Sequence, residues 1–130
     1  MTTRGAARIS IPLWLLLLAV AGCRIVPIMD VDVGLAAPQG VTIDEVGQAV
    51  MQAASELGWN VEAKEAGSAK ATLRLRKHVA VVDIHYGTRS LRIDYVRSEN
   101  LMASGNEIHR NYNNWVKNLS VRIQSKVAKL

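Results

Sequence analysis

Apolar residues recur at helical spacing between Thr42 and Leu57. Thr42 and Glu45 have the Thr-x-x-Glu spacing of a capping box, and Val41 and Val46 are placed to pack across the first turn. Gly58 follows at the position where helices often end in a left-handed backbone conformation. The pattern predicts a helix over residues 42–57 that buries one stripe, formed by Ile43, Val46, Val50, Ala53, Ala54 and Leu57.

From Trp59 the apolar period changes to two, which is typical of half-buried strands. One strand is predicted to start at Trp59, and three further strands are predicted over residues 71–75, 80–86 and 91–95. The apolar positions are odd-numbered in 71–75 and even-numbered in 80–86, and one straight strand cannot change parity. A turn or bulge must therefore lie near residues 76–78, and Gly87-Thr88 makes the next turn. The result is an antiparallel meander with one apolar and one polar face.

Helical spacing returns in the last segment of the chain. Residues 100–106 are predicted to be a loop, with Ser104 or Asn106 as the N-cap of a helix over 107–130. The apolar stripe of that helix is Ile108, Tyr112, Trp115, Val116, Leu119, Ile123 and Val127. Two amphipathic helices and one amphipathic sheet bury each other as two layers. We therefore predict an α+β two-layer sandwich, with a meander of three to four strands and both helices on one face.

The N-terminal region has the features of an export signal. Residues 1–10 contain two arginines and no acid, and the apolar run 11–21 is shorter than the about 20 residues that cross a bilayer. Val20-Ala21-Gly22-Cys23 resembles the lipobox of bacterial lipoproteins. This resemblance implies cleavage before Cys23 and attachment of diacylglycerol and an acyl chain such as palmitate to that residue. The alternative is an ordinary secreted protein that keeps one unpaired cysteine.

The predicted domain organisation is a signal peptide over 1–22, the lipidated Cys23 with a tether over 23–40, and one domain over 41–130. The tether is predicted because residues 24–40 mix Val, Ile and Asp with prolines and glycines, with a short extended piece at 29–33. Arg24, and not Asp, follows the cysteine. In lipoproteins of enteric bacteria this favours the outer membrane, so we expect the protein in its inner leaflet, facing the periplasm.

Charge and length narrow the possible partners. The formal charge is +5, and it falls to +3 when Arg4 and Arg8 leave with the signal peptide. This mild excess is not typical of a nucleic-acid-binding protein. The mature part has the length of one domain and no second apolar segment of membrane-spanning length. The expected partners are the membrane, through the lipid, and an envelope protein or an anionic polymer.

Features between Trp59 and Leu119 resemble a family of small proteobacterial envelope lipoproteins of uncharacterised function. The most specific feature is Ile108-His109-Arg110-Asn111-Tyr112-Asn113-Asn114-Trp115. The alternation from His78 to Tyr86 and the group Ile93, Tyr95 and Ser98 add weaker support. The resemblance implies a lipoprotein address and an α/β fold. It implies no activity and no catalytic residue.

Charged side chains gather on the predicted polar sheet face. One interpretation is a site for an anionic envelope ligand, such as a lipid phosphate or a polysaccharide carboxylate. The other is a lattice of cross-strand charge pairs, each contributing about 0.2–1 kcal/mol, which is the usual composition of a solvated face. The residues concerned are Arg74, Arg76, Asp83, His85, Arg92 and Asp94.

A second candidate group is His109, Asn111 and Asn113, which flank Tyr112 near the predicted helix start. Amides and rings recognise sugars, but polar groups at helix starts also satisfy free backbone groups. His78, His85 and His109 lack the spacing of a zinc site, and neither a phosphate loop nor a nucleophile elbow occurs. We therefore expect no metal, no cofactor and no enzyme, although a pocket lined by Asp83, His85 and Asp94 would indicate a hydrolase.

These observations favour a non-catalytic envelope lipoprotein that acts through protein contacts. The alternative is a binding module that holds an anionic or glycan envelope component on its polar sheet face.

Overall fold

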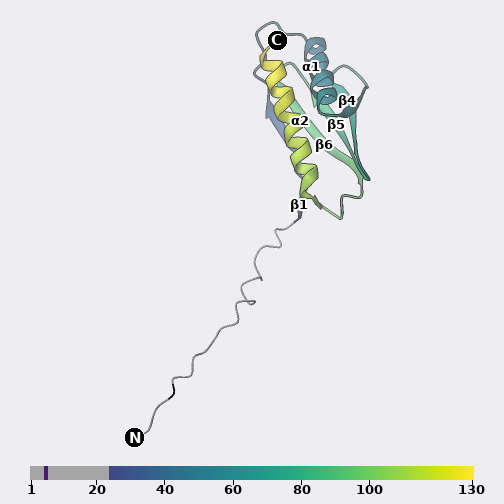
Figure 1. Ribbon diagram of the computed structural model, residues 1–130. Coiled ribbons are helices and arrows are strands. Elements are labelled where there is room, and N and C mark those ends of the chain that lie inside the picture. Colours follow the sequence, from purple (N-terminus) through teal and green to yellow (C-terminus); the bar gives the residue numbers. More distant parts are fainter. Residues whose placement is uncertain (1–4, 6–23) are drawn as a thin grey trace.

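The computed structural model describes residue 5 and residues 24–130 (Figure 1). Cys23 and, apart from Gly5, the predicted signal peptide lie outside the described residues. Seven strands and two helices follow in the order β1 (Ile25–Pro27), β2 (Val31–Gly34), α1 (Ile43–Glu56), β3 (Trp59–Ala63), β4 (Ser68–Leu75), β5 (His78–Tyr86), β6 (Ser90–Glu99), β7 (Glu107–His109) and α2 (Arg110–Ala128).

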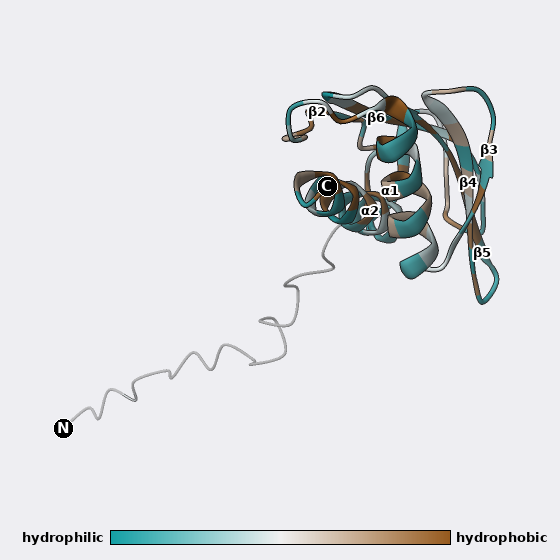
Figure 2. Cartoon of the chain, turned by 90° about the horizontal axis from the view of Figure 1, so that it is seen from above, coloured by the Kyte–Doolittle hydropathy of each residue, from teal (hydrophilic) through white to brown (hydrophobic). Residues whose placement is uncertain are grey.

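The main sheet has five antiparallel strands in the order β2-β6-β5-β4-β3, and β1 pairs separately with β7. Figure 2 shows both helices on the same side of the curved sheet. The buried apolar residues of the helices and strands form one core cluster. The predicted α+β class is confirmed. The predicted meander corresponds to β3 to β6, and β2 adds a fifth strand. Neither helix in residues 24–130 has the length and apolar character needed to cross a membrane.

Local sequence signals determine where α1 begins and ends. The Thr42 hydroxyl accepts from the Glu45 N–H at 3.2 Å, and the Glu45 carboxylate accepts from the Thr42 N–H at 2.8 Å, which confirms the capping box. Gly58 has φ +86° at the end of the helix. Gly47 is buried against β5, where an added Cβ would lie 2.7 Å from the Tyr86 hydroxyl oxygen. A small residue here lets the helix approach the sheet.

The parity change between β4 and β5 is resolved by a two-residue turn, as predicted. Leu75 pairs with His78, and Arg76 takes a positive φ of 57° between them. A second irregularity lies in β6, where Val81 pairs with Arg97 but Val82 pairs with Tyr95. The extra residue is Val96, and it changes the parity of β6, so that Arg97 and Glu99 lie on the outer face and Ser98 lies opposite the buried Ala80.

The prediction of a tether over residues 23–40 is wrong for the part that the structure describes. β1 pairs with β7, and β2 pairs with β6, while Val31 and Leu35 are buried in the core. The predicted extended piece at 29–33 is confirmed in part as β2. Both strands are short and interrupted by Pro and Gly, and their partners lie more than 50 residues away, so the local pattern resembles a linker. At the start of the range 24–130, the Arg24 carbonyl oxygen accepts from the Arg110 N–H at 2.7 Å.

The predicted start of the second helix is also wrong. Glu107–His109 forms β7 because this segment pairs with β1, and α2 begins at Arg110. The N-cap is His109, and neither Ser104 nor Asn106. The rest of the predicted stripe is buried except Trp115, which is partly buried. The Tyr112 ring meets the Tyr95 ring edge-on at 5.4 Å between centroids.

One carboxylate joins the two helices. Glu56, at the end of α1, accepts from Arg122 at 2.7 Å and from Lys126 at 2.6 Å, both in the last half of α2. These two cations, Lys126 first, hold the pKa of Glu56 below its usual value.

Candidate functional site

Strand register places the predicted polar residues in two rows across the outer face of the main sheet. In the first row, Arg92 on β6 lies between Asp32 on β2 and His85 on β5. In the second row, Asp83 lies between Lys70 and Asp94. The structure thus brings Asp83, His85, Arg92 and Asp94 together, as the alternation predicted.

Ion pairs link these side chains to one another. Lys70 Nζ lies 3.8 Å from Asp83, and Arg92 Nε lies 3.1 Å from Asp94, whose other neighbour is His85 Nε2 at 3.6 Å. All five side chains are more than a third exposed. Exposed pairs of this kind contribute about 0–1 kcal/mol each. The geometry matches the interpretation as a charge lattice, in which Lys70 and Arg92 offset the repulsion between the facing Asp83 and Asp94.

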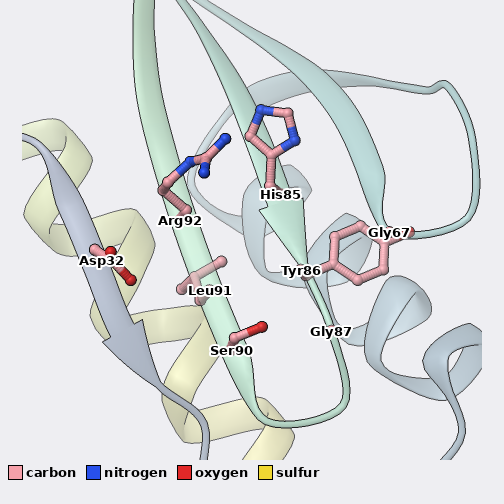
Figure 3. A pocket seen from close by; sticks show the side chains of 8 residues that line it. All are labelled: Asp32, Gly67, His85, Tyr86, Gly87, Ser90, Leu91 and Arg92. Atoms are coloured by element: carbon pink, nitrogen blue, oxygen red, sulfur yellow. The ribbon is translucent and has the colours of Figure 1, made fainter.

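A shallow pocket of about 310 Å³ lies along the first row, from Asp32 on β2 to Gly67 before β4 (Figure 3). Asp32, His85 and Arg92 supply its charged lining, and Asp83 and Asp94 do not line it. Sequence reasoning missed Asp32 because it assigned this residue to the tether. The alternation in Val31-Asp32-Val33 was the only signal that β2 would bring it here.

The two remaining arginines of this group are separated from it. Arg74 lies on the outer face but pairs in register with Val79, two residues before the turn. Arg76 is in the turn itself, so its predicted place on the sheet face is wrong. The turn consumes two residues and removes Arg76 from the strand alternation. Neither arginine has an ion-pair partner within residues 24–130.

The second predicted group has structural roles. Asn113 receives the Met29 N–H on Oδ1 at 2.9 Å, and its amide nitrogen donates to the Pro27 carbonyl at 2.9 Å. His109 Nδ1 accepts from the Asn111 N–H at 3.1 Å as the N-cap of α2. Asn113 therefore ties the chain between β1 and β2 to the helix, and both ends of its amide are already in use. This matches the interpretation in which polar groups at the helix start satisfy backbone groups, and the sugar contact stays an untested prediction.

His78 also has a structural position. Its Nδ1 donates to the Asn100 carbonyl at 2.7 Å, and its ring centroid lies 6.2 Å from that of Trp115. The Asn100 amide in turn donates to the Lys77 carbonyl at 2.6 Å. These bonds join the β4–β5 turn to the loop after β6. In residues 24–130 no group of three or more His, Cys, Asp or Glu side chains is arranged to hold a metal ion.

A groove of about 390 Å³ runs between the edge strand β2 and α2, and the sequence did not predict it. Its apolar lining includes Met29, Val33 and Val121, and Lys117 and Gln124 supply polar groups. Val121 is 56% exposed although it lies in a helix with a well-defined buried stripe. This valine outside the buried stripe was the feature of the sequence that could have indicated the groove.

One polar group in the core has no partner. The Tyr112 hydroxyl is fully buried and finds no hydrogen bond among residues 24–130. Burial raises the pKa of Tyr112 far above its usual value, and Tyr95, Asp30 and Asp94 add to the shift. Tyr112 therefore stays protonated under all physiological conditions.

Comparison with known proteins identifies no relative. No protein-family model, no curated protein sequence and no solved structure matches the chain.

Proposed function

We propose that this protein is a lipid-anchored component of the bacterial cell envelope that acts without catalysis, by binding another protein in the groove between β2 and α2. The observation that carries the proposal is the combination of an apolar groove with an open sheet edge. β2 pairs with β6 on one side, and no strand of residues 24–130 pairs with its other side.

An extended segment of a partner fits this arrangement. The free N–H and C=O groups of an edge strand can pair with an added strand, and adjacent apolar pockets then select its side chains. Val33 and Met29 lie beside the edge, and Val121 offers apolar surface from the helix side. We expect the partner to present alternating apolar residues to the groove.

Site-specific crosslinking in cells tests this proposal. A photoreactive phenylalanine analogue in place of Val121 should form one defined adduct, which mass spectrometry identifies. The same analogue in place of Glu62, on the outer face of the sheet, is the matched control and should form none. The substitution Val33→Lys places a charge on the edge, which opposes strand addition, and should remove the Val121 adduct. A missing adduct at Val121, or one that is also formed at Glu62, contradicts the proposal.

The anchor is a separate part of the proposal. The lipobox-like sequence supports acylation of Cys23, and Arg24 supports the inner leaflet of the outer membrane, facing the periplasm. Labelled palmitate should enter the wild-type chain and be absent from Cys23→Ser. Absence of the label from the wild-type chain, or equal labelling of the two proteins, would contradict the anchor.

The alternative ligand, an anionic or glycan polymer on the polar sheet face, has weaker support. Most cations on that face are already paired with carboxylates. Retention of the double variant Arg74→Glu, Arg92→Glu on such a polymer should therefore equal that of the wild type. Loss of retention in a folded variant would favour the alternative.

A further inference from the structure

Four segments meet at one end of the body, which we call the β1 end: Arg24, the turn Arg76-Lys77, the loop 100–106 and Arg110. The Arg110 N–H donates to the Arg24 carbonyl, and the His109 N–H donates to the Leu101 carbonyl at 2.8 Å. The Asn100 amide binds the Lys77 carbonyl, so the turn joins the same end. Figure 1 shows β1 and the start of α2 at this end and the C-terminus at the other.

The β1 end carries the whole charge excess of the body. The chain has 16 Lys and Arg and 11 Asp and Glu, and Arg4 and Arg8 precede the body, which leaves 14 and 11. Four of these cations (Arg24, Arg76, Lys77 and Arg110) and the carboxylate Glu107 lie at the β1 end, and Glu99 beside the loop is paired with Arg97 at 3.2 Å. The remaining residues, with this pair included, therefore have ten charges of each sign. All four cations are exposed, and none has an ion-pair partner within residues 24–130.

Apolar side chains are exposed beside these cations. Met102 in the loop is 58% exposed, and Leu75 at the turn is 47% exposed. Met102 also has a positive φ of 53°, a conformation that an unbranched apolar residue adopts only at a cost. Its side chain gains little burial in return. The start of α2 adds the positive end of a 19-residue helix whose first turn contains no acid.

We propose that the β1 end is a membrane-contact surface that lies flat against anionic phospholipid headgroups. The position of Arg24, the residue next to Cys23, favours a lipid surface over any other occupant of the β1 end. Arg24 is bound to Arg110 at the β1 end and follows Cys23 directly in the sequence, so a lipid on Cys23 would bring the β1 end to the surface that holds it. Exposed cations with adjacent apolar side chains are the groups that bind an anionic bilayer surface. The β2–α2 groove is then held at a fixed height above the lipid.

This inference deepens the anchor part of the proposed function, but its test does not depend on acylation. The mature chain with Cys23→Ser, whose buried core lies within residues 31–127, is sedimented with vesicles. Vesicles of equal parts phosphatidylcholine and phosphatidylglycerol should bind it, and pure phosphatidylcholine should not. Because each basic residue near an anionic surface contributes about fivefold in affinity, Arg76→Glu with Lys77→Glu should weaken binding by at least about 25-fold.

A matched charge reversal at the opposite end controls for net charge. Arg89 lies in the β5–β6 turn and Lys129 at the end of α2, and both are exposed. Arg89→Glu with Lys129→Glu changes the net charge equally but should leave vesicle binding within about twofold, because screening by salt confines the attraction to charges near the lipid. Absence of binding by the parent chain, or equal losses in the two double variants, overturns the proposal.

Orientation is measured on the lipidated chain. Ala103→Cys at the β1 end and Thr88→Cys in the β5–β6 turn are each labelled with a polarity-sensitive dye, and brominated phosphatidylglycerol is the quencher. The two sites lie beyond opposite ends of the nine-residue β5, roughly 27 Å apart along the strand. Quenching at residue 103 but not at residue 88 is expected. Equal quenching at both sites, or none at residue 103, rejects the proposed orientation and leaves acylation and partner binding as separate questions.

Discussion

The outer face of the main sheet and the β1 end both carry many charges, but the charges are arranged differently. On the sheet face, strand register sets Lys70 against Asp83, and Arg92 lies 3.1 Å from Asp94 two residues along the same strand, so these cations are paired with carboxylates. At the β1 end the cations come from segments far apart in the sequence, and of the two carboxylates nearby, Glu107 and Glu99, the second is already paired with Arg97. The comparison teaches that the number of charges in a region matters less than whether the fold has already paired them.

The largest effect on stability is expected at Asn113, which ties the segment between β1 and β2 to α2. Asn113→Ala removes two hydrogen bonds that join the β1–β2 segment to α2, each contributing about 1 kcal/mol, so unfolding in urea should show a loss of about 2 kcal/mol. The exposed neighbour Asn114 provides the control, and Asn114→Ala should change stability by less than about 0.5 kcal/mol. Equal losses would show that the β1 end is not fixed by this side chain.

A smaller effect of opposite sign is expected at Met102. Asn tolerates a positive φ better than Met does, so Met102→Asn should stabilise the fold by up to about 1 kcal/mol. The same change removes an apolar side chain from the proposed membrane-contact surface and should weaken vesicle binding. Ala103→Asn, at a neighbouring loop position without positive φ, should show no gain in stability. A variant that is more stable and binds vesicles as well as the parent would remove Met102 from the proposed surface.

A substitution in the charge lattice of the sheet face should change the free energy of unfolding less than Asn113→Ala or Met102→Asn. Arg92→Gln breaks an exposed pair with Asp94, so the free energy of unfolding should fall by less than about 1 kcal/mol, and vesicle binding should not change. Urea denaturation and vesicle sedimentation measure the two quantities. A large loss in either would mean that the sheet face does more than hold its own charges in pairs.

The helix layer contains a third arrangement, in which one carboxylate serves two cations. The pKa of Glu56 is lowered in the folded state by Lys126 and Arg122, so Glu56 stabilises the fold above its unfolded pKa of about 4.5, and this contribution is lost as the pH falls through its folded pKa. Glu56→Gln should therefore be less stable than the wild type at pH 7, and the difference should shrink below pH 4.5. Glu65→Gln, in the β3–β4 turn, is the control. A difference that is independent of pH would exclude the ion pairs as its cause.

Much of the fold followed from local patterns. The capping box at Thr42, the stop at Gly58, the parity change before His78 and the apolar stripe of α2 were predicted correctly, because each depends on residues a few positions apart. The edge strand β2 and the β1–β7 pair were not predicted. Their segments are too short to show a period, and their hydrogen-bond partners are distant in the sequence.

The candidate sites likewise contain residues that local patterns placed correctly and residues whose position depends on distant strand pairing. The alternation was sufficient to bring Asp83, His85, Arg92 and Asp94 to one face, whereas Asp32 reached that face only through the pairing of β2 with β6. Asn113 could be recognised as polar and near a helix start, but its two bonds to Pro27 and Met29 depend on where the N-terminal segment folds. No local rule predicts such a contact across more than 80 residues.

The sequence by itself predicted helix α1, the central parts of the strands from β3 to β6 and the layer arrangement, because these depend on short-range periodicity. The export signal and the lipidation of Cys23 stay predictions from the sequence. Only the tertiary structure decided that Arg24 is bound to the start of α2, that four cations without ion-pair partners in residues 24–130 gather at that end, and that an apolar groove opens along β2. The physical reason is that long-range strand pairing, and not local preference, determines where the two ends of the folded chain meet.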